Sequence, residues 1–233
     1  MKIAVINFSG NVGKSTVARH LLLPRVPGAE LIAIESLNAD EGQGQALRGR
    51  QFGELQEYLQ TVSSVVVDIG ASNVEELMAQ MQRYRGSHED FDAFVVPTVP
   101  ALKQQQDTIA TVIELNRLGV SASRLKLVFN MVDAGVTVAQ VFDPLLAFLK
   151  QKPIARVNLN CKLGANEIYG RIKGTKTDLS ALATDPTDHK ALIAQAKDTI
   201  EKLALARKLA TRRLASGVVP ELDVCFAALE FKP

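Results

Sequence analysis

Near the start of the chain, glycines, a lysine and two hydroxyl residues stand at a spacing that suits the binding of phosphate. The lysine is Lys14, and it follows a glycine turn that leads from an apolar run into a helical pattern. Glycines let a backbone approach an anion, and successive N–H groups at the start of a helix point towards it. We therefore predict a phosphate-binding loop made of Ser9, Gly10, Asn11, Val12, Gly13, Lys14, Ser15 and Thr16.

Two of these side chains have defined roles in such a loop. The ammonium of Lys14 would reach the β- and γ-phosphates, and the hydroxyl of Ser15 would coordinate Mg²⁺. The spacing departs from the common Walker pattern, because the first glycine of that pattern would fall at Phe8. The alternative interpretation is a glycine-rich turn that joins a strand to a helix and leaves the lysine exposed.

A second chemical group follows the apolar run Val65 to Val67, which ends in Asp68, Ile69 and Gly70. A carboxylate at the tip of a buried strand is typical of a Walker B element. Asp68 would hold Mg²⁺ through water, and the N–H of Gly70 would contact the γ-phosphate and respond to its presence. Taken alone, a strand-terminal Asp is more often a turn or capping residue.

The elements that must position these residues alternate between strand and helix along the chain. Short apolar runs, rich in β-branched residues, predict strands buried on both faces, at Ile3 to Ile6, Leu31 to Ile34, Val65 to Val67, Phe94 to Val96, Leu125 to Phe129 and Ile154 to Leu159. Helical patterns lie between them, at about Lys14 to Leu23, Gln45 to Leu59, Val74 to Tyr84, Leu102 to Leu118 and Val138 to Lys150. This order predicts a doubly wound α/β fold whose mostly parallel sheet is flanked by helices, with ligands bound at the carboxyl ends of the strands.

Length and composition fit one soluble globular domain over residues 1–233. We expect a nucleotide-binding core over residues 1–160, followed over 161–233 by a loop and a helical C-terminal extension of the same domain. The stretch from Gly170 to Asp188 reads as a long loop. No transmembrane stretch or secretory signal is recognisable, so a cytoplasmic protein is expected. Cys161 and Cys225 lack metal-ligand spacing and are expected to be reduced structural thiols.

Several features of the chain occur together, namely the loop, an acidic segment near Glu35, the Asp-x-Gly at Asp68, the Pro97 to Pro100 segment and Asn130. With these features the chain resembles the ParA/MinD family of deviant Walker ATPases. Within that family the chain is most similar to StbB-like plasmid stability and conjugation proteins. The resemblance covers roughly residues 1–160 and implies a P-loop NTPase fold, ATP and Mg²⁺ as cofactors, and a role for Asn130 in binding the base.

Two departures from the family pattern bear on hydrolysis. The signature lysine that reaches the partner's phosphates in the family's nucleotide-sandwich dimer is replaced by Ser9. Leu37 stands where the water-orienting Asp is expected, which leaves Glu35, Asn38 or Asp40 as substitutes. We assign Asp40 to the catalytic group together with Lys14 and Asp68, and we expect slow or partner-stimulated hydrolysis.

The preferred base is predicted from the segment Asn130 to Asp133. It follows a strand as the Asn-Lys-x-Asp guanine reader of GTPases does, with Met131 in place of the lysine, and Asp133 has a carboxylate that suits a guanine edge. ATP is preferred here, with GTP as the alternative. A turn capped by Asn130 and Asp133 would also explain the residues.

The C-terminal region is the basic part of the chain, because residues 151–233 hold 14 Lys and Arg against 9 Asp and Glu. Its basic side chains stand among alanines and leucines in a helix pattern: Lys190, Lys197, Lys202, Arg207, Lys208, Arg212 and Arg213. Such a face is usually only solvated. The functional alternative is non-specific binding to DNA phosphates. The apolar segment Val224 to Phe231 is expected to pack as a last strand or to dock on a partner, and it lacks the basic face of a membrane-binding helix.

Three classes of function remain. The first is a ParA/MinD-like switch that uses ATP and Mg²⁺ in plasmid stability, DNA segregation or conjugative transfer, as a homodimer or with a protein partner, with weak or partner-activated ATPase activity. The second is a P-loop small-molecule kinase or synthetase, although His20, His88 and His189 stand in no motif that supplies a catalytic base. The third is a non-catalytic nucleotide-binding adaptor, which Ser9 and Leu37 favour.

Overall fold

A six-stranded parallel sheet forms the centre of the protein. The structure is a computed structural model and describes residues 1–34, 49–175 and 177–231. The strands run in the order β2-β3-β1-β4-β5-β6, and every neighbouring pair is parallel. Their bounds are β1 Lys2–Val5, β2 Glu30–Ile34, β3 Val65–Ile69, β4 Ala93–Thr98, β5 Leu125–Val132 and β6 Lys162–Gly164.

Helices connect the strands and continue beyond the sheet. The helix after β1 starts as α1 (Lys14–Thr16) and goes on as a π-helical segment (Val17–Leu22) and a 3₁₀ turn (Leu23–Arg25). Two further 3₁₀ turns lie at Ala71–Asn73 and Ser87–Asp90. The remaining described helices are α2 Gly49–Thr61, α3 Val74–Arg83, α4 Leu102–Arg117, α5 Val138–Val141, α6 Asp143–Gln151, α7 Ile168–Arg171, α8 Leu179–Ala183, α9 His189–Gln195 and α10 Thr199–Ala228.

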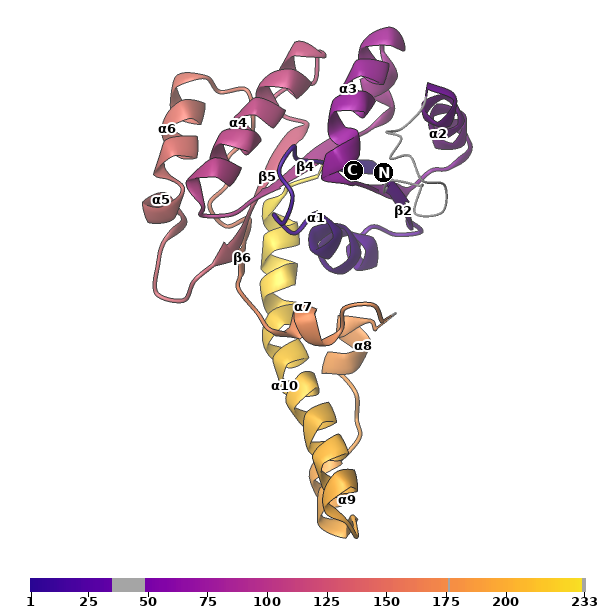
Figure 1. Cartoon of the computed structure of the whole chain (residues 1–233), viewed down its shortest axis with the longest axis vertical. Helices are drawn as coiled ribbons and strands as arrows, with labels where there is room; N and C mark the ends of the chain where they lie inside the picture. The colour runs from indigo at the N-terminus through magenta and orange to yellow at the C-terminus, as the bar shows by residue number, and fades with distance from the viewer. Residues whose placement is uncertain (35–48, 176, 232–233) are drawn as a thin grey trace.

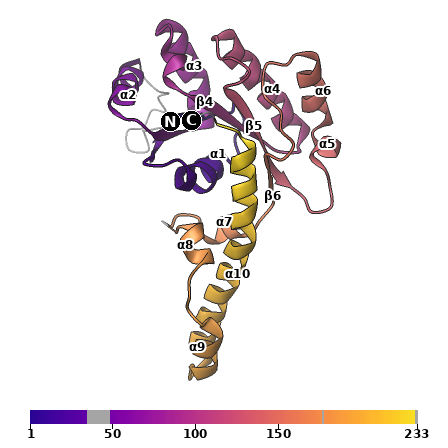
Figure 2. The ribbon, with the colours of Figure 1, turned by 180° about the vertical axis from the view of Figure 1, so that it is seen from behind.

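The sheet is covered on both faces, as its unalternating apolar strands require. Ala4 and Ile6 of the first strand and its extension point into a core shared with α2, α3, α4 and α6, while Ile3 and Val5 point to the opposite face. That second face is covered by the helix after β1, by α7 and α8, and by the C-terminal half of α10, as Figures 1 and 2 show from two sides. The doubly wound α/β architecture predicted from the sequence is therefore confirmed.

A helical arm projects from this body. In both views, the C-terminal end of α10 lies at the sheet, and its N-terminal end lies far from the sheet, with α9 alongside (Figures 1 and 2). The fully buried residues of α10 all lie in its second half, at Ala215, Val218, Leu222 and Cys225. We call α9 together with residues 199–214 of α10 the arm. It has few apolar contacts with the body, because its own half of α10 contributes no buried side chain.

The last predicted strand is wrong in position. Within Ile154 to Leu159, Arg156 makes one isolated bridge to Lys126, and the sixth strand is β6 instead. Asn158 explains the difference, because its Oδ1 accepts from the N–H of Asn160 and its Nδ2 donates to the carbonyl of Ala228. These bonds make a turn where the sequence suggested extended chain.

Three further predictions, of a helix, a loop and a strand, need correction. The helix expected over Val138 to Lys150 is broken at Phe142, whose φ is −116°, because Pro144 has no N–H to continue the first helix. The loop expected over Gly170 to Asp188 contains α8, which is capped by Asp178 and anchored by buried Leu179. The segment Val224 to Phe231 is not a strand, because most of it forms the last turns of α10.

Some predicted residues lie outside the described residues. They include the position of the expected water-orienting group and its possible substitutes, which are Leu37, Glu35, Asn38 and Asp40. The predicted start of a helix at Gln45 also lies outside the described residues. Among the described helices, none has the length and apolar character needed to cross a bilayer.

Candidate functional site

Three predicted groups come together because their strands are parallel neighbours or near neighbours. The loop after β1, Asp68 in β3 and Asn130 in β5 all lie at the carboxyl ends of their strands. Val5 pairs directly with Asp68, so the carboxylate stands beside the point where the loop begins. This edge is where ligands bind in open α/β sheets.

The loop from Gly10 to Lys14 has an unusual backbone. Asn11 and Gly13 both have positive φ, at 58° and 85°. In the part of the chain that the structure describes, the N–H groups of Gly10 to Lys14 donate to no protein acceptor, and a Cβ added to Gly10 would meet nothing within 4 Å. A run of free N–H groups around an open turn is the arrangement that holds an anion.

Lys14 is buried, with 8 % of its surface exposed, and its ammonium is folded over the loop itself. Its Nζ donates to the carbonyl oxygens of Ser9 at 2.6 Å and of Asn7 at 3.1 Å. Burial lowers the pKa of this amine from its ordinary value, and the charge of Asp68 opposes that shift. The charges of the Lys14 amine and the Asp68 carboxylate therefore interact, as expected of a lysine that contacts phosphate and an aspartate that holds Mg²⁺.

The predicted Mg²⁺ and sensor residues have different surroundings. Asp68 is 6 % exposed, whereas Ser15 lies at the surface. A hydroxyl and a carboxylate oxygen are ligands of the kind that Mg²⁺ takes beside nucleotide phosphates, so the donor set fits the ion. The N–H of Gly70 donates to the carbonyl of Ile34 at 2.9 Å, so the predicted contact with phosphate would have to replace that bond.

Asn130 is packed against the loop. Its Nδ2 donates to the carbonyl of Val12 at 3.0 Å, and its Oδ1 accepts from the N–H of Met131 at 2.9 Å. A Cβ on Gly13 would lie 2.2 Å from that Nδ2, which gives Gly13 a second reason to be glycine besides its positive φ. In this structure Asn130 fixes the loop, and its contact with a base stays a prediction. Asp133, the alternative base reader, is exposed.

A set of buried polar residues next to the loop was not predicted from the sequence. Asn7, Thr108 and Thr111 have no exposed surface, and they hydrogen-bond to one another or to the loop. Asparagine before the loop and threonines in a helix are ordinary residues in sequence, and about a hundred positions separate them. The polar residues at three-residue spacing on the inner face of α4 are the signal that would have drawn attention to them.

A clamp, formed by Arg25 and Asp223, joins the helix that follows the loop to the half of α10 that packs on the body. The Nε of Arg25 donates to Oδ1 of Asp223 at 2.9 Å, and its Nη2 lies 2.7 Å from the same oxygen. Its Nη1 also donates to the carbonyl oxygens of His20 and Leu21 at 2.9 and 3.2 Å. Arg25 thereby ties the end of the helix that begins in the loop to α10.

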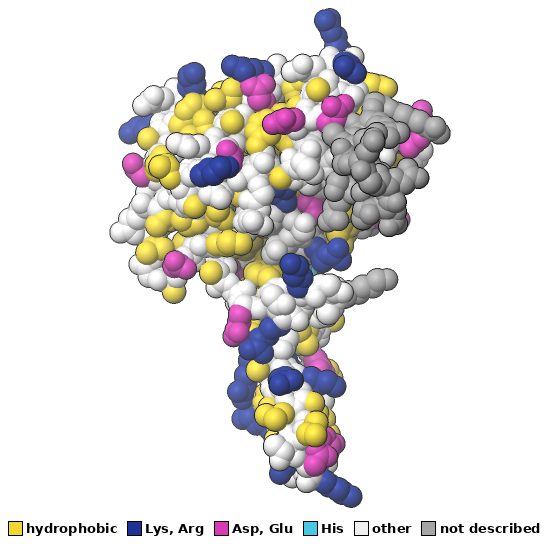
Figure 3. All heavy atoms as spheres, viewed as in Figure 1, with side chains coloured by type: hydrophobic (Ala, Val, Ile, Leu, Met, Phe, Trp, Pro, Cys, Tyr) yellow, Lys and Arg dark blue, Asp and Glu magenta, His cyan; other side chains and the backbone are white. Residues whose placement is uncertain are grey.

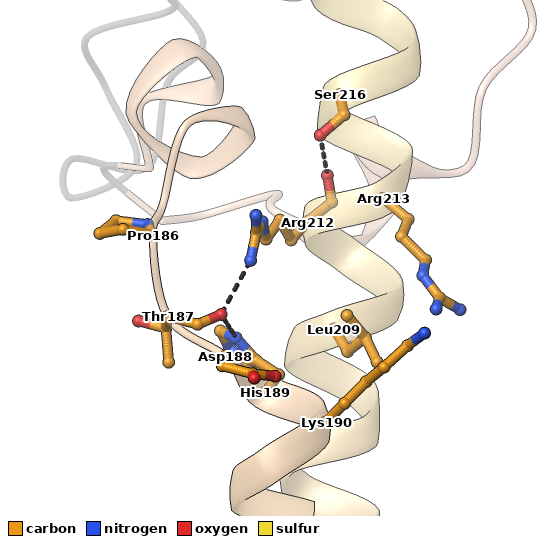
Figure 4. Close-up of a pocket in the computed structure, with 9 residues that line it drawn as sticks. All are labelled: Pro186, Thr187, Asp188, His189, Lys190, Leu209, Arg212, Arg213 and Ser216. Atoms are coloured by element: carbon orange, nitrogen blue, oxygen red, sulfur yellow. Dashed lines mark hydrogen bonds between the residues drawn. The ribbon is translucent and has the colours of Figure 1, made fainter.

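The arm carries most of the predicted basic residues and a pocket of about 500 Å³. Figure 3 shows Lys and Arg side chains along the arm, with apolar side chains towards its tip. Figure 4 shows the wall of the pocket, where Nη1 of Arg212 donates to the carbonyl of Thr187 at 2.8 Å. Lys190 and Arg213 come from the two different helices and line the same pocket. Arg212 is thus a structural residue, and the other two are exposed cations.

Comparisons with known proteins agree on the fold. No protein-family profile and no curated protein matches the sequence. Among solved structures, apo McdA from Cyanothece aligns with a TM-score of 0.51 and 13 % identity, over 89 % of this chain and 98 % of that one. The MinD cell division protein of Aquifex aeolicus aligns with a TM-score of 0.51 and 12 % identity, over 92 % and 96 %. The chain therefore has the α/β fold of MinD and McdA, with a helical C-terminal region.

Proposed function

We propose that this protein is a nucleotide-dependent switch of the ParA/MinD type that binds ATP with Mg²⁺ at the loop after β1. One observation carries the proposal: the N–H groups from Gly10 to Lys14 donate to no acceptor among the described residues, and the turn that holds them is open, with the buried Lys14 amine and Asp68 beside it. The MinD and McdA fold supports it, because the loop occupies the ligand-binding edge of the sheet.

Different described residues would bind different parts of the nucleotide and the Mg²⁺ ion. The backbone from Gly10 to Gly13 would surround bound phosphates, and Lys14 would exchange the carbonyls of Ser9 and Asn7 for phosphate oxygens. Ser15 and Asp68 would hold Mg²⁺, which supplies positive charge beside the phosphates. Ile34 and Gly70 are joined by a backbone hydrogen bond, so an arriving γ-phosphate that took the Gly70 N–H would change the end of β2 as well.

Hydrolysis is proposed to be slow without a partner. Ser9 is buried and has a hydroxyl side chain, so position 9 lacks the second cation that the family's signature lysine supplies. With one fewer charge to stabilise the transition state, chemistry depends on a protein partner. The proposed setting is plasmid stability, segregation or conjugative transfer in the cytoplasm, through a homodimer, a protein partner or DNA bound to the arm.

Nucleotide binding by the wild type and by Lys14→Ala tests the proposal. We expect Mg²⁺-dependent binding of a fluorescent ATP analogue by the wild type. Lys14→Ala should weaken it at least tenfold, because a charge-assisted contact worth about 1.5–3 kcal/mol is lost. Ser15→Ala should remove the dependence on Mg²⁺. Equal, weak binding by all three proteins would mean that the loop is only a turn.

Turnover separates this proposal from its alternatives. GTP assayed beside ATP decides the base. Phosphate release that stays low until a partner or DNA is added supports the switch. Binding that never leads to turnover supports a non-catalytic adaptor, and transfer of phosphate to a small acceptor without protein or DNA supports a kinase.

A further inference from the structure

The inner face of α4 contains buried polar residues where apolar ones would be expected. Its buried positions are Gln105, Thr108, Thr111, Val112 and Leu115, so polar residues fill the first half of the face. Burying a hydroxyl or an amide is costly unless each polar group finds a partner. Polar residues at such buried positions therefore call for an explanation in terms of the groups that they bind.

Thr108 and Thr111 both have hydrogen-bond partners in the segment after β1, and Oγ1 of Thr108 also lies 3.0 Å from Oγ1 of Thr98 in β4. Each hydroxyl donates to a carbonyl one turn back in its own helix, at 2.7 Å, which leaves its oxygen free to accept. Thr108 accepts from Nδ2 of Asn7 at 2.8 Å, and Thr111 accepts from the N–H of Phe8 at 3.1 Å. The helix therefore presents two acceptors to Asn7 and Phe8, the two residues that lead into the phosphate-binding loop.

Asn7 uses both polar groups of its side chain in this arrangement. Its Nδ2 also donates to the carbonyl of Pro97 in β4 at 2.9 Å, and its Oδ1 accepts from the N–H of Ser9 at 2.8 Å. Ser9 is the residue whose carbonyl holds the Lys14 amine. A continuous chain of hydrogen bonds thus runs from α4 through Asn7 to Ser9 and Lys14.

We infer that Asn7, Thr108 and Thr111 are positioning residues for phosphate binding, which fix the start of the loop so that its N–H groups and Lys14 face the ligand. A fully satisfied buried network is rigid, and a loop held in its binding geometry spends less free energy on ordering when ligand arrives. The inference rests on the proposed function and adds a second element, α4, to the binding site.

A matched set of variants in α4 tests it. Thr111→Val keeps the shape but removes the acceptor of the Phe8 N–H, Thr111→Ser keeps the hydroxyl, and Val112→Ala opens a cavity beside it without touching the loop. The dissociation constant for a fluorescent ATP analogue with Mg²⁺ and the free energy of unfolding are measured for each. Hydrogen exchange of residues 7–16 is followed in the nucleotide-free protein.

We expect Thr111→Val to weaken binding about fivefold, the equivalent of one lost hydrogen bond of about 1 kcal/mol, and to speed exchange in the loop. Thr111→Ser should bind within about twofold of the wild type by the same reasoning. Val112→Ala should lose stability while keeping its affinity. Unchanged affinity in Thr111→Val, or an equal loss in Val112→Ala, would overturn the inference.

The proposed function fails by a different result. If the wild type and Lys14→Ala both fail to bind nucleotide, the switch is ruled out and the inference falls with it. If the wild type binds and Lys14→Ala does not, the function stands, and the α4 variants alone decide whether these residues position the loop.

Discussion

At the scale of single residues, the amine of Lys14 donates to carbonyls of its own loop, those of Ser9 and Asn7. If phosphate binds as proposed, its oxygens would replace these two bonds, and the buried amine would stay satisfied in both states. The net gain in binding free energy from the lysine would then be a difference between two sets of bonds.

His20 gives a prediction for pH. Its ring is partly buried and packs on Tyr169, with ring centroids 5.7 Å apart. Burial and, to a lesser extent, Arg19 lower the pKa of His20 to about 4, although Asp178 opposes the shift. The unfolded chain then binds the proton more tightly, so stability is full above about pH 6.5 and is lost as the pH falls towards 4.

We expect this loss to amount to about 1–2 kcal/mol, because solvent screens a partly exposed ring. Urea unfolding of the wild type and of His20→Phe at pH 7 and 4.5 measures it. The variant keeps an aromatic ring beside Tyr169 but cannot titrate, so its stability should fall less between the two pH values. Equal losses in both proteins would show that other groups cause the dependence.

The sequence allowed part of the candidate site to be predicted. Gly13, Lys14 and Asp68 were found because spacing and strand context carry the information locally. Asn7 and Thr111 were missed, because their importance comes from a contact between residues 104 positions apart. Side-chain contacts over such separations leave no pattern in one sequence.

At the scale of elements, α10 combines two kinds of helix. Its second half is buried against the sheet, and its first half contributes to the arm. Leu222→Ala should cost about 2–5 kcal/mol, because it opens a cavity in the core. Leu203→Ala, at a position that is 53 % exposed, should change stability by less than about 0.5 kcal/mol.

Chemical denaturation of these two variants checks the division of α10. They make the same chemical change in the same helix, so helix propensity cancels between them. Similar losses of stability would mean that the arm packs against something in solution, as a dimer or a bound partner would allow. That result would change the description of the arm but not that of the loop.

Local patterns explain which elements were predicted correctly. Buried strands such as β3 and β4 stand out because β-branched and aromatic residues fill them without alternation. The failures are at Asn158, Phe142 and Asp178, where one side chain or one backbone angle starts or ends an element. Apolar periodicity does not contain that information.

At the scale of the whole molecule, alternation of strand and helix was sufficient to predict the parallel sheet and its two covered faces. The arm was not predicted, because the same helix pattern fits a helix packed along the body and one that projects from it. The difference lies in which half of α10 is buried, and both halves contain leucine and alanine. A basic exposed face was expected, and the structure places much of it on the arm.

If the arm binds DNA, its exposed cations must carry that binding. A test variant has alanine in place of Lys190, Arg207, Lys208 and Arg213, and we expect it to be retained less on non-specific DNA. The slope of log binding constant against log salt concentration should become shallower by about three to four, because each phosphate contact contributes about 0.9 to it. Arg212 is left in place, since it holds Thr187. Retention is measured as salt is raised.

The control removes the same number of charges from the body. Arg83, Arg85, Lys103 and Arg117 are exposed there, and their replacement by alanine gives an equal change in net charge. Equal weakening in both variants would indicate general attraction to the whole surface. Unchanged retention in the arm variant would leave its basic face with solvation as its only role.

The second half of α10 is held by the body from Ala215 onward, and the Arg25 clamp at Asp223 lies within this held half. The helix rises about 1.5 Å per residue, so the part from Ala215 back to its start at Thr199 is about 24 Å long. A tilt of about 10° where α10 leaves the body would displace its tip by about 4 Å, by the same helix geometry. Because Arg25 ends the helix that begins in the loop and contacts the held half of α10, a small rotation of that helix passed on to α10 would be enlarged at the tip of the arm.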